Sequence, residues 1–183
     1  LSNYVYKSKL DIKLYIETRA EGINNKTLKL LKKLKVNGVG MGLELSNEDF
    51  RKESLNRFVD TKKIEDEFKI LKKNKINTTA YNIIGLPNQT EESVQDTIKF
   101  NRKIKPNVSS VAYYSAYEGT NLKEKAIENF DFYPTNMDAQ IRGKIKSHQI
   151  KSELLDFYKS NFNLLINQKK LDFKKVKKSW FKT

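Results

Sequence analysis

The sequence predicts an α/β fold, namely a partial (β/α) barrel whose parallel sheet has about four strands, followed by a C-terminal helical extension. Two observations lead to this fold class. Segments with strand character alternate with segments of helical periodicity, as in the right-handed βαβ units that build a parallel sheet. Four strands are too few to close a barrel, so the sheet must be open. We expect the barrel part in residues 1–128 and the helical extension, with a Lys-rich tail, in residues 129–183.

The strand-like segments are rich in apolar and β-branched residues, and turn-forming residues separate them from the helices. They cover residues 12–20, 36–44, 76–86 and 108–117. Pro87 closes the third segment, because proline lacks the N–H that a strand would donate. From Phe130 the alternation ends, and residues 138–168 indicate one long helix or two.

Helices between the strands are predicted from capping residues and from apolar residues at helical spacing. The predicted helix starts are Asn24 or Asn25, Ser46, Thr61, and Thr90 with Glu91. The predicted buried positions are Leu28, Leu31 and Leu34, then Ile64, Phe68 and Leu71, then Val94 and Ile98. These helices supply the crossovers that parallel strands require.

The composition excludes several kinds of site. The chain has no cysteine, which excludes disulfides, cysteine nucleophiles and thiolate-bound metals within these residues. The single histidine, His148, shares a helical stripe with Ile141 and Ile145, which indicates a packing role rather than a catalytic one. No apolar run reaches membrane-spanning length and no signal peptide opens the chain, so we expect a cytoplasmic protein without membrane contact.

The net charge of +14, from 36 basic and 22 acidic residues, by itself suggests a polyanionic partner. Only five of the basic residues are arginine, which phosphate recognition favours, so most lysines are interpreted as solvated surface charge. The exception is the segment 168–183, where lysines alternate with Phe173, Trp180 and Phe181. Its composition favours a frayed basic terminus, with contact to RNA or to a protein partner as the alternatives.

The second strand segment has glycine at every other position, namely Gly38, Gly40 and Gly42. Side chains alternate between the two faces of a strand, so these glycines share one face with Glu44 while the apolar residues between them share the other. Glycine weakens a strand, and a row of glycines leaves space beside the backbone that something other than a side chain can fill.

The first strand segment has the same two-sided pattern. Its apolar face carries Ile12, Leu14 and Ile16, and its polar face carries Lys13, Tyr15, Glu17 and Arg19. We therefore expect one face of the sheet to be covered by helices and the other to be polar and partly empty. Glu44, Glu17 and Arg19 stand at the carboxyl ends of neighbouring strands, where parallel sheets bind ligands. The pattern favours a cavity; in the alternative, the glycines make room for bulky neighbours and Glu17 pairs with Arg19.

Several motifs, in this order, resemble those of the radical S-adenosylmethionine superfamily, in particular the branch that often carries a cobalamin-binding domain. Residues 16–48 are similar to a strand, a helix and a strand that ends in a Gly-Ile/Leu-Glu-Ser motif. Residues 81–100, YNIIGLPNQTEESVQDTIKF, resemble the next strand with its Gly-Leu-Pro-Gly-Glu-Thr turn. Residues 112–122, AYYSAYEGTNL, resemble the sixth strand with its Pro-Tyr-Pro-Gly-Thr-x-Leu turn. The resemblance covers roughly residues 12–128.

The sequence departs from the family pattern in three ways. Asn88 replaces the turn glycine, which is tolerable because asparagine visits left-handed conformations. Ala116 and Glu118 replace two prolines, so we expect a looser last turn. The family's first two strands, with the three-cysteine loop that ligates a [4Fe–4S] cluster, do not occur in these residues. We therefore expect a piece of a longer protein that is inactive on its own.

The resemblance implies cofactors for that longer parent protein: S-adenosylmethionine, a [4Fe–4S] cluster and, as a further candidate, cobalamin. In the family, reductive cleavage of S-adenosylmethionine yields a 5′-deoxyadenosyl radical that abstracts hydrogen from a small-molecule substrate. Two alternatives stay open: a non-catalytic scaffold that binds a protein partner, and an RNA-binding or RNA-modifying module that uses the basic tail. We also expect the first strand at an exposed sheet edge, where the N-terminal half of the barrel or a partner would pair.

The resemblance also assigns cofactor-binding residues: Glu17, Arg19, Gly40, Gly42, Glu44, Arg57, Tyr114 and Tyr117. It implies that Glu44 accepts hydrogen bonds from the ribose hydroxyls, and that Glu17 and Arg19 contact polar groups of the cofactor or the substrate. Arg57 would pair with the cofactor carboxylate, or alternatively with Glu44 or Glu53. Residues 113–117 would lie along the adenine, with ordinary core packing as the alternative for Tyr113 and Tyr114.

Overall fold

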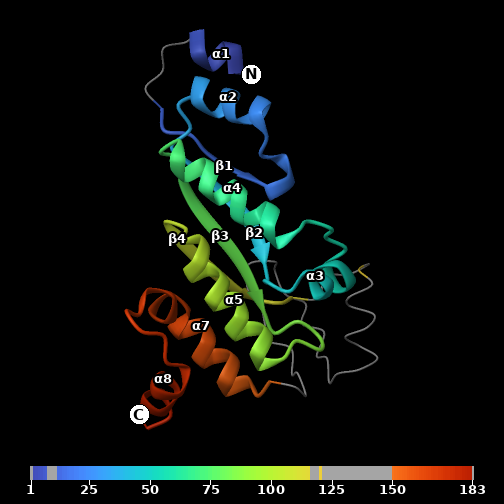
Figure 1. Cartoon of the computed structure of the whole chain (residues 1–183), viewed down its shortest axis with the longest axis vertical. Helices are drawn as coiled ribbons and strands as arrows, with labels where there is room; N and C mark the ends of the chain where they lie inside the picture. Colours follow the sequence, from blue (N-terminus) through green and yellow to red (C-terminus); the bar gives the residue numbers. More distant parts are fainter. Residues whose placement is uncertain (1, 8–11, 116–119, 121–149, 183) are drawn as a thin grey trace.

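The computed structural model describes residues 2–7, 12–115, 120 and 150–182. Its centre is a four-stranded parallel sheet in the order β1-β2-β3-β4 (Figure 1). The strands are β1 (Tyr15–Thr18), β2 (Gly38–Glu44), β3 (Asn77–Ile84) and β4 (Val108–Tyr113). The predicted α/β class and the four-stranded parallel sheet are confirmed.

Strand β1 lies at an edge of the sheet, as predicted, and within the described residues it pairs only with β2. It is shorter than the predicted segment 12–20, and β4 ends at Tyr113 rather than at residue 117. After β4, the backbone N–H of Tyr114 donates to the carbonyl of Ile84, the last residue of β3. The pairing therefore stops close to the carboxyl end of β3.

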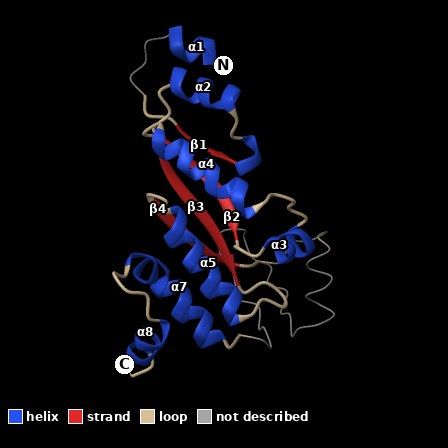
Figure 2. Cartoon of the chain, in the orientation of Figure 1, coloured by secondary structure: helices blue, strands red, loops and turns tan. Residues whose placement is uncertain are grey.

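Three crossover helices connect the strands: α2 (Asn25–Lys33), α4 (Thr61–Lys73) and α5 (Glu91–Ile104). They bury one face of the sheet, where Val39, Met41 and Leu43 of β2 are fully buried against apolar residues of all three helices (Figure 2). The two-sided pattern predicted for the sheet is thus present, with the glycines on the face opposite these helices. Shorter elements are α1 (Ser2–Lys7), a 3-10 turn η1 (Ala20–Gly22) and α3 (Glu48–Leu55).

Two of the predicted helix caps are confirmed and two are wrong. Asn24 and Thr90 cap α2 and α5 by accepting from the backbone N–H groups of Thr27 and Ser93. Helix α3 starts one residue later than predicted, because Asn47 rather than Ser46 accepts from the third N–H of the helix. Thr61 is the first helical residue of α4, and its hydroxyl donates to the carbonyl of Ser46 instead of capping the helix.

The C-terminal part contains α7 (Ser152–Asn167) and α8 (Phe173–Trp180). Helix α7 packs against α5 and β4, and Arg102 of α5 donates to the carbonyls of Leu165 and Ile166 at 2.9 and 2.7 Å. The predicted helical extension is therefore present in its described part. The rest of the predicted helix 138–168, including His148, lies outside the described residues, as do Ala116, Tyr117 and Glu118.

The basic segment forms helix α8, so the prediction of a frayed terminus is wrong. Asp172 caps this helix by accepting from the N–H of Lys175, and Val176 is only 9% exposed. The aromatic rings of Trp180 and Phe181 contact the ring of Phe157 in α7. Apolar contacts within a lysine-rich stretch thus order the segment. None of the helices described is long and apolar enough to span a bilayer.

Arg51 of α3 binds backbone carbonyls both before and after its own helix. Its side chain is fully buried, and it donates to the carbonyls of Leu45 at 2.6 Å and of Val59 at 2.7 Å. Further donations reach the carbonyl of Ser46 and the hydroxyl of Thr61. The segment between β2 and α4 is therefore held to one guanidinium group, which fixes where residues 44 and 57 stand.

We predict that Arg51→Met lowers the free energy of unfolding by about 3 kcal/mol, because buried carbonyls lose their donors. Urea denaturation of the purified chain measures this change. Lys52→Met, one residue further in the same helix but on its exposed side, is the matched control and should change stability little. Equal effects of the two variants would contradict the role assigned to Arg51.

Candidate functional site

A pocket of about 490 Å³ opens at the carboxyl ends of β1, β2 and β3, on the sheet face opposite the crossover helices. This volume lies within the range of small-molecule sites. Its lining residues are Glu17, Thr18, Arg19, Gly40, Gly42, Glu44, Leu55, Arg57, Tyr81 and Ile83. The pocket thus unites six of the eight residues predicted for the site and is lined by two carboxylates and two guanidinium groups.

The register of the sheet explains why these residues meet. Glu17 of β1 pairs with Gly40, and Gly42 pairs with Tyr81 of β3, so the side chains on both sides of β2 face the glycines. After Gly42 the register shifts, and Glu44 takes a left-handed backbone conformation with φ 62°. That conformation costs a residue other than glycine about 1 kcal/mol. The irregular end of β2 brings the Glu44 carboxylate back over Gly42.

Glu44 forms an ion pair with Arg57 inside the pocket. Nη1 of Arg57 donates to Oε1 of Glu44 at 2.7 Å, and Nη2 lies 3.6 Å from Oε2 of Glu21. The side chains of Arg57 and Glu44 are 10% and 16% exposed. Of the alternatives for Arg57, the pairing with Glu44 is therefore present, and Glu21 rather than Glu53 is its second acidic neighbour.

Burial and neighbouring positive charges shift the pKa of Glu44 in opposite directions. Desolvation raises the pKa of its carboxyl group, while Arg57, and more weakly Arg19 and Arg51, lower it, and the net result is a pKa above the ordinary value. Nε and Nη2 of Arg57 are buried and have no hydrogen-bond partner among the residues that the structure describes. Since unpaired buried donors are costly, the guanidinium is suited to a further acceptor such as a ligand oxygen.

The space above the first two glycines is filled, which corrects the prediction of an empty row. A Cβ atom on Gly38 would lie 2.9 Å from the ring of Tyr15. A Cβ atom on Gly40 would lie 2.6 Å from both the Tyr15 hydroxyl and the Tyr81 ring. Both interpretations of the glycines therefore apply in part. Gly38 and Gly40 make room for bulky neighbours. The pocket extends over Gly42 and also over part of Gly40.

One predicted site residue that the structure describes, Tyr114, does not line the pocket. Tyr114 is 7% exposed and packs in an apolar cluster with Leu45 and Leu86, where burial raises the pKa of its phenol to about 12. Tyr117 lies outside the described residues. Conversely, the lining residues Thr18, Leu55, Tyr81 and Ile83 were not predicted. Tyr81 and Ile83 alternate with the buried residues of β3, so the parity argument used for β1 and β2 would have found them.

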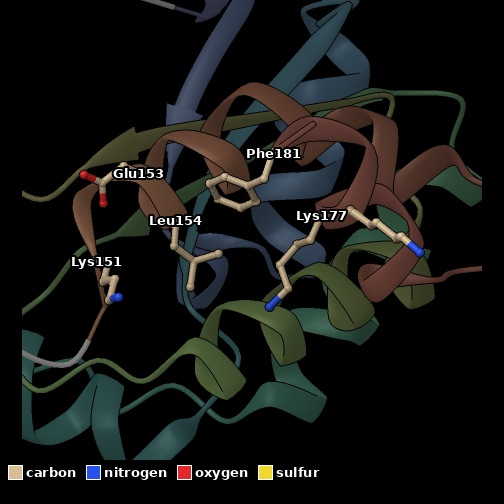
Figure 3. Close-up of a pocket in the computed structure, with 6 residues that line it drawn as sticks. Lys151, Glu153, Leu154, Lys177 and Phe181 are labelled. Carbon is tan, nitrogen blue, oxygen red and sulfur yellow. The ribbon is translucent and has the colours of Figure 1, made fainter. Parts of the chain in front are cut away.

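A second hollow, of about 480 Å³, lies between the start of α7 and the end of α8. Figure 3 shows Leu154 and Phe181 between the amino groups of Lys151 and Lys177. Lys177 already pairs with Glu91 of α5 at 2.6 Å. The polar atoms of this hollow belong to long side chains at the surface, so we regard the pocket over β2 as the candidate site.

We predict that Arg57→Gln lowers the free energy of unfolding by about 2 kcal/mol at neutral pH, because Glu44 would then be buried without a counter-charge. The loss should shrink as the pH falls, since burial has raised the pKa of Glu44 and a protonated carboxyl needs no partner. Urea denaturation at neutral and at acidic pH tests both statements. Lys62→Gln, which removes an exposed pair with Asp66, should have little effect at either pH.

Comparison with known proteins gives two curated relatives. An uncharacterized methyltransferase of Pyrococcus horikoshii is 30% identical over 120 residues, which cover 66% of this chain and 26% of that protein. An anaerobic magnesium-protoporphyrin IX monomethyl ester cyclase of Rubrivivax gelatinosus is 29% identical over 159 residues, 80% of this chain and 27% of that protein. The chain thus spans about a quarter of the length of these curated relatives.

The fold has counterparts among solved structures. Coproporphyrinogen III oxidase of Escherichia coli, described as a radical SAM enzyme, superimposes with a TM-score of 0.64 at 22% identity, over 84% of this chain and 32% of that one. The likeness supports the partial-barrel architecture. The family model of the radical SAM superfamily matches residues 3–100, which include β1 to β3 and most of α5. This chain therefore belongs to the radical SAM superfamily.

Proposed function

We propose that this chain forms the S-adenosylmethionine-binding part of a radical SAM enzyme, and that the pocket over β2 holds the cofactor. The observation that carries the proposal is the convergence of Glu17, Arg19, Glu44 and Arg57 on one pocket at the carboxyl ends of the strands. Parallel α/β sheets bind ligands at this end.

The chemistry of the pocket fits the cofactor. S-adenosylmethionine has ribose hydroxyls and an ammonium group that donate hydrogen bonds, a carboxylate that accepts them, and a positively charged sulfonium. Glu17 and Glu44 offer acceptors, and Arg19 and Arg57 offer donors. The buried Nε and Nη2 atoms of Arg57, which have no hydrogen-bond partner within the described part of the chain, are placed for an acceptor oxygen. The hydrogen-bond donors and the acceptors of the cofactor thus both have complementary groups in the pocket.

The residues then have distinct roles in binding. The Glu44 carboxylate would accept hydrogen bonds from the ribose hydroxyls, and Arg57 holds that carboxylate over Gly42. Glycine at position 42 leaves room for this ion pair, because a Cβ atom there would overlap Oε1 of Glu44 and lie 2.8 Å from Nη1 of Arg57, so both side chains would have to shift. Glu17 and Arg19 would contact the remaining polar groups of the cofactor.

The [4Fe–4S] cluster that the family uses does not fit the residues of this chain. Such clusters are ligated by cysteine thiolates, and the chain contains no cysteine. We therefore derive no step through the cluster, and in this proposal its ligands belong to other residues of the parent protein. We also assign no residue of this chain to cobalamin. The part assigned here is to bind and orient S-adenosylmethionine.

We predict that Glu44→Ala weakens S-adenosylmethionine binding by about 10-fold or more, the effect of losing a hydrogen bond to a charged group. Isothermal titration of the full-length protein with reconstituted cluster measures the affinity. Glu44→Gln, which keeps the shape of the side chain, should fall between the native protein and Glu44→Ala. Glu53→Ala, an exposed glutamate on α3 outside the pocket, is the matched control and should bind like the native protein. Native-like affinity of Glu44→Ala would reject the proposed site.

The same titrations should depend on pH through Glu44. Because its pKa is raised, the carboxyl group takes up a proton at a higher pH than an ordinary glutamate does, and it then loses its charge and part of its acceptor capacity. We predict that the affinity of the native protein falls when the pH is lowered from neutral toward acidic values. This acidic loss should be smaller in Glu44→Gln, and an identical pH profile for both proteins would assign it to another group.

A further inference from the structure

We propose that Tyr81, held by Tyr15, is a positioning residue that forms the floor of the pocket and keeps the carboxylate of Glu17 directed toward the bound cofactor. The inference rests on the proposed function and adds to it a device that sets the depth of the pocket. It follows from how two side chains of different strands meet above a third strand.

Tyr15 belongs to β1 and Tyr81 belongs to β3, so β2 lies between them. Their hydroxyl oxygens are 3.2 Å apart, which means that both rings reach across the strand between them. This is possible only because β2 has no side chains there: Cβ atoms on Gly38 or Gly40 would lie within 3 Å of these rings or hydroxyls. The glycines of β2 therefore permit a bridge between its two neighbours.

The bridge ends on Glu17. The Tyr81 hydroxyl donates to Oε1 of Glu17 at 2.7 Å. Hydrogen bonds with Tyr15 and Glu17 raise the pKa of Tyr81 above its ordinary value, so the phenol keeps the proton that it donates. Glu17 is otherwise an exposed residue of an edge strand, and a free carboxylate there would populate several rotamers. The bond to Tyr81 selects one rotamer, which lowers the entropic cost of binding a ligand through this carboxylate.

The Tyr81 ring closes one side of the pocket, and the Tyr15 ring packs beside it outside the pocket lining. They occupy the inner face over Gly38 and part of Gly40, and Gly38 is absent from the residues that line the pocket. A ligand can therefore descend only as far as the Tyr81 ring, and its polar groups must lie between Glu17 on one side and Glu44 on the other. In this arrangement Glu17 binds a hydrogen-bond donor of the cofactor, and the tyrosines act only through Glu17 and through the shape of the floor.

A double-mutant cycle with Tyr81→Phe and Glu17→Ala tests the proposal in the full-length protein with reconstituted cluster. We expect Tyr81→Phe to weaken S-adenosylmethionine binding by about 3- to 10-fold in the native background, the effect of one hydrogen bond. In the Glu17→Ala background, which has no acceptor for the Tyr81 hydroxyl, the same change should have no further effect. Tyr4→Phe, an exposed tyrosine of α1, is the matched control and should leave the affinity unchanged. Equal losses in both backgrounds, or no loss in either, would overturn the positioning role.

A second cycle, measured without ligand, separates this proposal from the proposed function. Tyr81→Phe should lower the melting temperature by about 2–4 °C in the native background, as expected for one hydrogen bond in a chain of this size, and hardly at all in Glu17→Ala. If the native protein fails to bind S-adenosylmethionine but this coupling is present, the proposed function falls and the tyrosine bridge stands. If the shifts in melting temperature caused by the Tyr81 and Glu17 substitutions are additive, the two side chains do not interact, and the proposed bridge is wrong whatever the protein binds.

Discussion

The site depends on one steric constraint, which is that strand β2 must have no side chains at positions 38, 40 and 42 of its inner face. Cβ atoms on Gly38, Gly40 and Gly42 would collide with side chains from β1, from β3 and from the segment before α4. Their absence lets groups from three separate parts of the chain meet above one strand. Glycine costs strand stability, and the opposite face of β2 offsets this cost, because Val39, Met41 and Leu43 are fully buried against the crossover helices.

Two arginines near the end of β2 stabilise different parts of the pocket. Arg51 is fully buried and binds backbone carbonyls, including those of Leu45, directly after Glu44, and of Val59, two residues after Arg57. Arg57 faces the pocket and binds the Glu44 carboxylate. The first interaction fixes the backbone at both ends of the segment, and the second fixes the side chains. A planar guanidinium group with several fixed donors suits both tasks.

Local sequence pattern predicted the faces of the strands but not the contacts across them. The alternation in β1 and β2 correctly placed Glu17, Gly40 and Gly42 on one face, because parity is a property of each strand alone. Arg19, one residue past β1, and Glu44, beyond the register shift in β2, line the same pocket through the irregular ends of their strands. The meeting of Tyr15 with Tyr81 depends on the register between strands, which no local pattern encodes. The role of Arg51 was not predicted, because a charged residue in a short polar helix is usually exposed. Its burial is stabilised by backbone carbonyls that come together only when the segment after β2 has folded.

The two carboxylates of the pocket have partners of different charge, so the two sides of the pocket differ in their electrostatic potential. Glu44 faces a guanidinium group, so much of its charge is neutralised locally. The described partner of Glu17 is a neutral phenol, which fixes the carboxylate but leaves its negative charge in place. Neutral hydroxyl donors suit the Glu44 side, and a cationic group gains more on the Glu17 side. Under the proposed function, an asymmetric cofactor with ribose hydroxyls at one part and positive charge at another would bind in one orientation for this reason.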